Sequence, residues 1–562
     1  MKRSTGTGVF GKSRFWAMIA ASCSASVMFG CGSSDNALTP GSGSSGSVGG
    51  AGTGGSSSTS PGGGMPASGG VPATGGAATT LPQPTGGNPA TGGAAAGGTA
   101  PATGGRAAGG AGIGGSVTGG KAAGGVVAGG QATSTGGSVA TAGAYTGTKT
   151  PGTAQTGDVT VDPTKTHQVV DGFGLADVWQ GSSSAAMQTL LWDPVNGIGL
   201  NLLRIGIEST SGKSVLMGNA GTADGQACVK FSGSACKIWA APWSPPASMK
   251  TNNNVNGNSA NACTATATSR LNTASYDAWA TLLAAFPAYY KQQSGLDLYA
   301  MSAQNEPDWN PNYEACCYTS GEMVNFIKVL GPKLAALNPP VKLLAAEPDN
   351  WSNMWSGDNY SPAIIADATA NSLVDVLATH DYGNTSAGTY GRPAPPATNK
   401  HHVWETECTP GDTGPITIAT MIYAAFSTGG VNGWHYWWTQ AFIPNASSPP
   451  AQYYALGNFS KFVKAGYYRA DVSGAKTPSG SVPLVVAFTS LTDGKVAIVV
   501  VNAGAAQQIS LFVAGTAWPA SVTPYVTTAS SKLAAGTDIA VTAGRFSASL
   551  AAASVTTFVG AP

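Results

Sequence analysis

Two glutamates follow apolar, strand-like segments of the sequence. Glu306 comes after residues 296–303, and Glu407 comes after residues 401–404. Carboxylates at the carboxyl ends of buried parallel strands are typical of catalytic sites in (β/α)8 barrels. In glycoside hydrolysis, one carboxyl group protonates the leaving oxygen while a second attacks the sugar or activates water. The two positions therefore indicate a glycosidase-type catalytic pair.

The second carboxylate has two competitors. Glu405 lies two residues before Glu407, and on a regular strand both side chains point into the barrel while Thr406 points out. Glu407 is favoured because it lies nearer the end of the strand, where the active site is expected. Glu347 follows another apolar segment, residues 341–346, and we assign it to the rim of the site.

Arg204 and Asn305 are expected to support the pair. Arg204 ends an apolar run, where an arginine is costly unless it is paired. Its charge would lower the pKa of a partner carboxyl group and keep that group ionised, as a nucleophile requires. A purely structural pair with Glu208 or Asp177 is the alternative. Asn305 is placed to hold a sugar hydroxyl.

Aromatic and histidine side chains near strand ends are the remaining substrate-binding candidates. His380 and Tyr382 follow the apolar segment 374–379. Strand alternation predicts that Tyr436 and Trp438 face one way and that Trp437 faces the other. Because flat aromatic rings suit the apolar faces of sugars, we select Trp243, Trp309, Trp437 and Trp438.

No cofactor or metal is expected, because two carboxylates and water suffice for this chemistry. We interpret His401 and His402 as structural or surface residues, since no third ligand and no Cys-x-x-Cys spacing accompanies them. The formal net charge of +1 at pH 7 provides no field that favours nucleic acid or an acidic membrane surface.

Eight apolar segments can supply the strands that position these residues. Near-continuous apolar runs are typical of parallel strands buried on both faces. Helical patterns occur between several of them, and eight strand–helix units favour a closed (β/α)8 TIM barrel over residues 172–457. The predicted strands are residues 172–176, 202–207, 238–243, 296–304, 341–346, 374–379, 402–406 and 433–438, and the predicted helices are residues 276–290, 321–337 and 416–426.

The last part of the chain has a different pattern. Residues 458–562 alternate Val, Ala and Thr with Gly, Asp and Ser turns, which is typical of an antiparallel β-sandwich. The strand-like residues 158–171 have no place in the barrel. We predict that they join the sheet of the tail, so that the side domain is discontinuous.

The N-terminal part is interpreted as an export signal followed by a tether. Basic residues precede an apolar stretch, residues 15–30, that is too short to span a bilayer. We expect residues 1–31 to be a signal peptide with lipidation at Cys31; processing at Cys23 or ordinary secretion is the alternative. Residues 32–157 are rich in Gly, Ala, Ser and Thr and are expected to form a flexible, disordered linker. The expected location is extracellular or the outer-membrane surface of a bacterium.

Export also favours disulfide bonds among the cysteines beyond the linker. Cys228 and Cys236 lie eight residues apart in a polar region, and we predict a bridge between them. The sequence leaves the pairing of the other four open, namely Cys263, Cys316, Cys317 and Cys408.

The ordered set of motifs resembles glycoside hydrolase family 30, from about residue 168 to residue 469. This resemblance implies a barrel with a side β-sandwich built from both chain ends. It implies that Glu306 is the acid/base and Glu407 the nucleophile of a retaining reaction, with the carboxyl groups about 5–5.5 Å apart. The matching stretches are residues 168–174 (QVVDGFG), 203–206 (LRIG), 242–252 (PWSPPASMKTN), 304–307 (QNEP), 404–407 (WETE) and 453–462 (YYALGNFSKF).

Within this family, residues 242–252 and 304–308 are most similar to the endo-xylanase branch. Members specific for glucuronic-acid-decorated xylan carry an Arg just after the eighth strand, whereas residues 437–442 contain none here. We therefore predict an enzyme that cleaves plant cell-wall xylan without needing glucuronate, and we expect it to be a monomer. The alternatives are a β-1,6-glucanase, a β-1,6-galactanase, a glucosylceramidase-like enzyme, or a non-catalytic carbohydrate-binding lipoprotein.

Overall fold

The computed structural model describes residues 149–209, 221–258, 262–264, 266–384, 392–474 and 483–562. The expected signal peptide with Cys31, and the linker up to residue 148, lie outside these residues. Among the described helices, none has the length and apolar character needed to cross a membrane.

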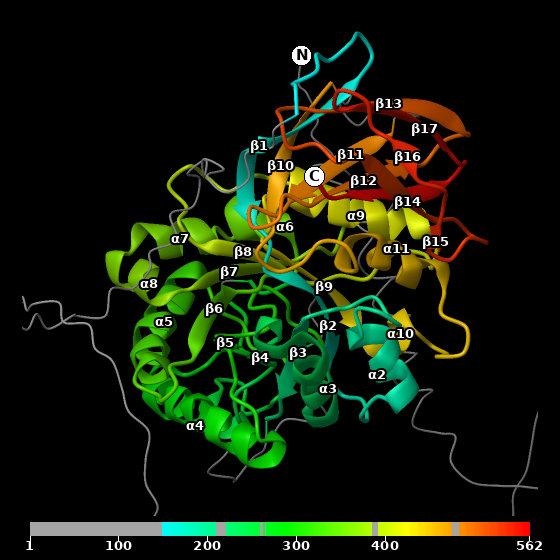
Figure 1. Ribbon diagram of the computed structural model, residues 1–562. Coiled ribbons are helices and arrows are strands. Elements are labelled where there is room, and N and C mark those ends of the chain that lie inside the picture. Colours follow the sequence, from blue (N-terminus) through cyan, green and yellow to red (C-terminus); the bar gives the residue numbers. More distant parts are fainter. Residues whose placement is uncertain (1–148, 210–220, 259–261, 265, 385–391, 475–482) are drawn as a thin grey trace, which may run out of the picture. The chain divides into compact units, whose positions relative to one another are not determined.

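Eight parallel strands close into a barrel, as predicted (Figure 1). Each strand pairs with the next along the chain, and the last returns to pair with the first. Nearly all their residues are buried, which explains the near-continuous apolar runs in the sequence. The fourth is only three residues long, shorter than expected. The strands are β2 Gly172–Asp177, β3 Leu202–Ile207, β4 Lys237–Pro242, β5 Ala300–Ser302, β6 Lys342–Ala346, β7 Val376–His380, β8 His402–Glu407 and β9 Gly433–Trp438.

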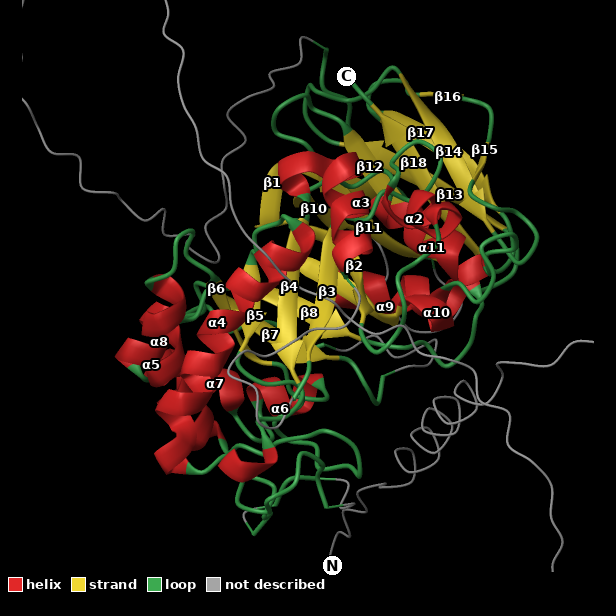
Figure 2. Cartoon of the chain, turned by 90° about the horizontal axis from the view of Figure 1, so that it is seen from below, coloured by secondary structure: helices red, strands yellow, loops and turns green. Residues whose placement is uncertain are grey.

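Helices lie around the outside of these strands (Figure 2). The three helical patterns in the sequence correspond to α4, α5 and α9. The helices are α2 Ala185–Trp192, α3 Thr222–Ser232, α4 Tyr276–Ser294, α5 Ser320–Ala335, α6 Trp351–Trp355, α7 Tyr360–Ala366, α8 Ala368–Leu373, α9 Pro415–Ser427, α10 Thr439–Phe442 and α11 Ala451–Ser460, with short 3₁₀ turns at Gly233–Ala235, Ala247–Met249 and Thr273–Ser275.

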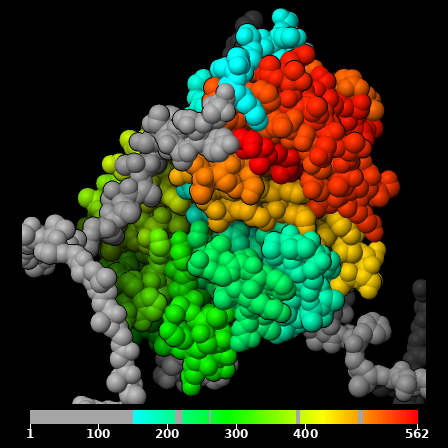
Figure 3. Space-filling model, in the orientation of Figure 1, coloured from blue at the N-terminus to red at the C-terminus, as the bar shows by residue number. Residues whose placement is uncertain are grey.

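A ten-stranded, mostly antiparallel sheet forms the side domain. Its first strand, β1, pairs with β10 and β13 near the other end of the chain, which confirms that the domain is discontinuous (Figure 3). Phe546 and Phe558 lie six places apart in the strand order, yet their ring centroids are 5.3 Å apart, so the sheet folds over one core. The strands are β1 Val159–Val169, β10 Tyr468–Ser473, β11 Leu484–Thr489, β12 Val496–Asn502, β13 Gln507–Val513, β14 Ser521–Thr527, β15 Ala534–Ala535, β16 Ile539–Ala540, β17 Arg545–Leu550 and β18 Ser554–Gly560.

The helix α9 joins the two cores. Its Phe426 ring centroid lies 5.3 Å from that of Phe173 in the barrel and 5.4 Å from that of Phe488 in the side domain. Because both faces of α9 are covered, almost all of its residues are buried. The side domain therefore braces the wall of the barrel.

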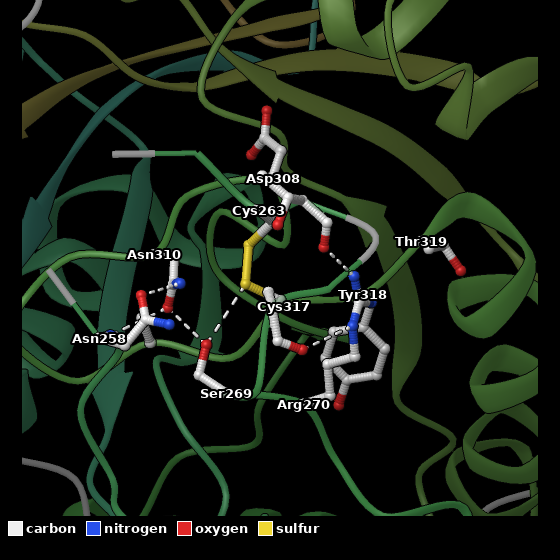
Figure 4. The surroundings of a disulfide bond; sticks show 12 residues. Asn258, Cys263, Ser269, Arg270, Asp308, Asn310, Cys317, Tyr318 and Thr319 are labelled. Carbon is white, nitrogen blue, oxygen red and sulfur yellow. Dashed lines mark hydrogen bonds between the residues drawn. A yellow bond between two sulfur atoms is a disulfide. The ribbon is translucent and has the colours of Figure 1, made fainter. Parts of the chain in front are cut away.

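Two disulfide bonds join four of the six cysteines that the structure describes. One is the predicted bridge between Cys228 and Cys236. The other joins Cys263, in the segment after β4, to Cys317, in the segment after β5 (Figure 4). Cys316 and Cys408 are buried and free.

Candidate active site

Glu306 lies in a tight turn four residues beyond β5. Its φ angle is +44°, a left-handed conformation that costs a side-chain-bearing residue about 1–2 kcal/mol. The turn is held by backbone hydrogen bonds, from Glu306 N to the carbonyl of Glu347 (3.0 Å) and from Asn305 N to the carbonyl of Pro242 (2.9 Å). Strained conformations of this kind persist where the surrounding structure holds a functional group in place.

A bulge in β8 determines which glutamate enters the barrel. Thr379 of β7 pairs with Glu405 and the next residue, His380, pairs with Glu407, so Thr406 is the extra residue. Glu407 consequently lies inside the barrel, where it contacts Arg204. The expectation that Glu405 and Glu407 point the same way is wrong, because the bulge interrupts the alternation.

Glu405 faces the helix layer instead. It is fully buried, beside Cys408 and Trp434, in surroundings that belong to the core between strands and helices. Burial, followed by the charge of Asp381, raises the pKa of Glu405 well above its ordinary value. This shift favours the protonated form of Glu405, and its surroundings place it outside the candidate pair.

Arg204 binds three side chains inside the barrel. One guanidinium nitrogen donates to Glu407 Oε2, and the other donates to Asn305 Oδ1 and to Glu347 Oε1 (3.1 Å). The structural alternatives for Arg204, Glu208 and Asp177, are not its ion-pair partners. Arg204 thus links the turn of Glu306 to Glu407.

His380 and Tyr382 connect to the same pair. His380 Nδ1 lies 3.1 Å from Glu306 Oε1, and the Tyr382 hydroxyl donates a 2.7 Å hydrogen bond to Glu407 Oε1. Both residues were predicted from their place after an apolar segment. The structure brings them to the candidate pair together with Arg204 and Asn305.

Glu347 is not at the rim of the site, as the sequence suggested. It is completely buried, and its Oε1 lies 3.1 Å from Arg204 Nη2 and 3.5 Å from His380 Nε2. The sequence signal was the same as for the other two glutamates, a carboxylate at the end of an apolar segment. The error arose because chain order does not reveal how far a strand-end side chain reaches toward the centre.

Burial and neighbouring charges shift the pKa values of three groups at the site. Burial raises the pKa of Glu306 to about 7, with a smaller contribution from the charge of Glu407, while His380 opposes the rise. Burial alone would lower the pKa of His380, but Glu407, Glu306 and Glu347 raise it to about 10. Burial would raise the pKa of Glu347, but Arg204 and His380 hold it below its ordinary value.

Aromatic rings form one wall of the site. Trp243 and Trp437 both stack near Arg204, whose guanidinium carbon lies 4.8 Å and 5.8 Å from their ring centroids. Trp179, which the sequence analysis missed, packs against them with centroid distances of 4.9 Å and 6.3 Å. Trp179 is 40% exposed, whereas Trp243 and Trp437 are buried. Its position two residues after a strand end is the signal that could have identified it.

Trp438 is partly exposed at the end of β9, and Trp309 is buried in the segment after β5. A bulge between β2 and β9 lets Trp437 and Trp438 both contact the barrel interior while Tyr436 packs toward the helices, so the predicted alternation of these three residues is wrong. Trp438 donates its indole N–H to the carbonyl of Val178 (2.6 Å). Trp309 is 3% exposed.

The arrangement is suited to a two-carboxylate reaction. One oxygen of Glu306 and one of Glu407 lie within 4.8 Å of each other and of a nitrogen of His380. Retaining glycosidases hold their carboxyl groups about 5–5.5 Å apart, whereas inverting enzymes need about 6.5–9.5 Å. Although this spacing would also suit a cation, these atoms already contact one another, Arg204 and Tyr382, and we assign no metal to them.

Known proteins share these features of sequence and fold. Residues 225–406 match the family model described as the glycosyl hydrolase family 30 TIM-barrel domain. Over 423 residues, the chain is 29% identical to the glucuronoxylanase XynC of Bacillus subtilis strain 168, a match that covers 72% of this chain and 91% of the relative.

Two solved structures are similar over the same part of the chain. One is a glycoside hydrolase family 30 subfamily 8 xylanase, Xyn30A, from Clostridium acetobutylicum, with 29% identity and a TM-score of 0.61. The other is a family 30 endoxylanase from Clostridium papyrosolvens C71, with 32% identity and a TM-score of 0.58. Each match covers 72% of this chain and 100% of the solved chain.

Proposed function

Because this chain belongs to glycoside hydrolase family 30, we propose that it hydrolyses the β-1,4-linked backbone of xylan with retention of configuration. The observation that carries the proposal is the pair of buried carboxylates, Glu306 and Glu407, with oxygens within 4.8 Å of each other. The xylanase names of the relatives at 29–32% identity support the choice of substrate.

The reaction has two steps. Glu306 donates its proton to the glycosidic oxygen while Glu407 attacks the anomeric carbon, so the C–O bond breaks and a glycosyl ester forms on Glu407. In the second step, the Glu306 carboxylate removes a proton from a water molecule, and the oxygen of that water attacks the anomeric carbon. The ester bond breaks, Glu407 regains its charge and Glu306 its proton.

Neighbouring side chains prepare both carboxyl groups. The contacts of Glu407 with Arg204 and Tyr382 fix the orientation of its carboxyl group. The pKa of Glu306, raised to about 7 by burial, keeps this group protonated at mildly acidic pH. In the proposed reaction, Glu306 starts as the protonated acid and Glu407 as the attacking carboxylate.

Glucuronate side chains are not required for this activity in our proposal. Residues 437–442, at the end of β9 and in α10, contain neither Arg nor Lys. A glucuronate carboxylate is best held by a bidentate Arg, so a segment without one offers it little binding energy. The Bacillus relative is named a glucuronoxylanase, and the two enzymes should differ in this preference.

The test is product analysis with the full-length chain on linear xylan, glucuronoxylan, arabinoxylan and β-1,6-glucan. Glu407→Gln serves as the blank. We expect short xylo-oligosaccharides from all three xylans, with the β-anomer formed first in NMR spectra. Hydrolysis of glucuronoxylan alone would contradict independence from glucuronate, and activity only on the glucan would replace the proposed substrate.

Export and anchoring are part of the same proposal. The basic residues and apolar stretch before Cys31 support a signal peptide with a lipidated Cys31 as the mature N-terminus. Mass spectrometry of the membrane fraction should find a diacylglycerol-modified Cys31, and Cys31→Ala should release the protein. An unmodified N-terminus elsewhere would contradict anchoring.

A further inference from the structure

Glu347 occupies the centre of the barrel, immediately after β6. Its exposed fraction is 0%, and its φ angle of +61° is left-handed. A buried carboxylate is expensive unless it is fully compensated, and a left-handed glutamate adds further strain. Two such costs at one residue indicate that the residue performs a task beyond filling space.

The side chain of Glu347 binds both cations of the site through one oxygen. Glu347 Oε1 lies 3.1 Å from Arg204 Nη2 and 3.5 Å from His380 Nε2. Each of these cations contacts a member of the candidate pair on its other side, because Arg204 binds Glu407 and His380 Nδ1 lies 3.1 Å from Glu306. Glu347 is therefore connected to Glu407 through Arg204 and to Glu306 through His380.

The backbone of Glu347 reaches the turn of Glu306 directly. Its carbonyl accepts the 3.0 Å hydrogen bond from Glu306 N, while its own N–H donates to the carbonyl of Ala378 (3.0 Å). The residue thus connects the ends of β5, β6 and β7. A shift of Glu347 would displace Glu306 and His380 together.

The net charge of the five side chains Arg204, His380, Glu306, Glu347 and Glu407 is zero only when Glu347 is included. In the proposed reaction, Arg204 and His380 carry two positive charges, and Glu347 and the attacking carboxylate Glu407 carry two negative charges while Glu306 is protonated; the contacts that join these groups are the ones described above. When a glycosyl ester forms, Glu407 becomes neutral and Glu306 becomes negative, so the sum stays at zero. A low-dielectric site changes state most easily when its net charge does not change.

We propose that Glu347 is a positioning residue that holds His380 in its cationic form and Arg204 in its orientation, and through them controls the proton of Glu306. This inference rests on the assignment of Glu306 and Glu407 to the reaction. The electrostatic surroundings of His380 agree with it, because the nearby carboxylates raise the pKa of His380 to about 10.

Two further titratable groups, His435 and Tyr382, lie around His380. His435 on β9 is neutral, because burial lowers its pKa to about 3, and it adds no charge. The Tyr382 ring centroid lies 6.0 Å from that of His380, and burial keeps the pKa of its hydroxyl far above the ordinary value. The groups that face His380 are Glu306 from β5, Glu347 from β6, Glu407 from β8, Tyr382 from β7 and His435 from β9.

The decisive measurement is a pH titration of ¹⁵N-histidine NMR signals, which requires no substrate. The chain has only five histidines, so His380→Gln identifies the signal of His380. We expect both ring nitrogens of His380 to be protonated at pH 8 in the wild-type protein. In Glu347→Gln the titration should move to lower pH by about 1–3 units, as expected for the loss of one opposite charge at this distance.

Glu405→Gln is the matched control, because Glu405 is equally buried but faces the helix layer, and its raised pKa favours the neutral form. It should leave the His380 titration unchanged. A neutral His380 at pH 8 in the wild-type protein would overturn the proposal, and so would an identical titration in Glu347→Gln. The wild-type measurement keeps the test valid even if Glu347→Gln does not fold.

Kinetics on xylan provide the second readout. Removing the negative charge lowers the proton affinity of the whole group, so the basic limb of kcat/KM should move to lower pH by about 1 unit in Glu347→Gln. Glu347→Asp keeps the charge and should keep the limb while lowering kcat. A uniform loss of activity without a shift would reduce Glu347 to a structural residue. If the wild-type enzyme does not hydrolyse xylan, the proposed function is wrong. The NMR titration of His380 still tests the role of Glu347 in that case.

Discussion

The backbone amide of Glu306 donates a 3.0 Å hydrogen bond to the backbone carbonyl of Glu347. Both residues have positive φ angles, +44° and +61°. The connection ties the ends of β5 and β6 together at two positions with a left-handed backbone. Since Arg204 joins the Glu347 side chain to Glu407, the turn of Glu306 and the end of β8 form one unit.

Replacing either member of the candidate pair should abolish most activity without unfolding the protein. Loss of a general acid–base group typically costs about 10²–10⁴-fold in rate, and we expect Glu306→Gln to fall in this range on xylan. Glu407→Gln should lose more, because no glycosyl ester can form. Initial rates and circular dichroism of both variants provide the check, and a Glu407→Gln enzyme with ordinary turnover would contradict the assignment.

The activity should decline on the alkaline side of neutrality. Glu306 acts as an acid only while protonated, and its pKa is raised to about 7, so kcat/KM should fall as the pH rises through this value. The same group contributes stability that is present at low pH and lost as the pH rises through about 7, because its folded-state pKa exceeds its unfolded one. Glu306→Gln should therefore gain more in Tm relative to wild type at pH 8 than at pH 5. Equal Tm differences at both values would argue against the raised pKa.

Trp179 should contribute to substrate binding more than to stability. Trp179 is 40% exposed, and its ring packs against that of Trp243 with a centroid distance of 4.9 Å. Trp179→Ala should raise KM for xylan about 10-fold, equivalent to about 1.4 kcal/mol, with little effect on Tm. Trp179→Phe retains a flat ring and should recover part of the loss. A variant with unchanged KM would exclude Trp179 from the substrate path.

The two disulfides should differ in their effects. The Cys263–Cys317 bridge spans 54 residues and the Cys228–Cys236 bridge spans eight. The loss of loop-closure entropy in the unfolded chain therefore stabilises the protein by about 4 and about 2.5 kcal/mol, respectively. Cys263 N also donates to the carbonyl of Asp308, two residues after Glu306 (Figure 4). We therefore expect Cys263→Ser/Cys317→Ser to lower both Tm and kcat.

The double variant Cys228→Ser/Cys236→Ser is the control for this comparison. This bridge lies at the end of α3 and makes no contact with the candidate site, so only Tm should fall. Thermal denaturation and xylan kinetics measured on both double variants distinguish the two roles. An equal loss of kcat in both would indicate a general loss of structure.

The sequence by itself determined the barrel, the side domain and most of the candidate site. Buried parallel strands must be apolar on both faces, so the eight strands are visible as apolar runs. Carboxylates that follow such runs are exceptional, which is why Glu306 and Glu407 could be selected. Arg204 could be identified for the same reason, because an unpaired charge inside a strand would be too costly.

Only the tertiary structure decided how these side chains are oriented. The bulge at Thr406 turns Glu405 outward and Glu407 inward, and a bulge depends on pairing with the neighbouring strand, which the sequence of one strand does not contain. The central position of Glu347 depends on contacts across the barrel. Its partner Arg204, for example, lies 143 positions earlier in the sequence. Alternation along a strand is a local property, whereas the register between strands and the meeting of side chains at the barrel axis are set by the closure of the whole sheet.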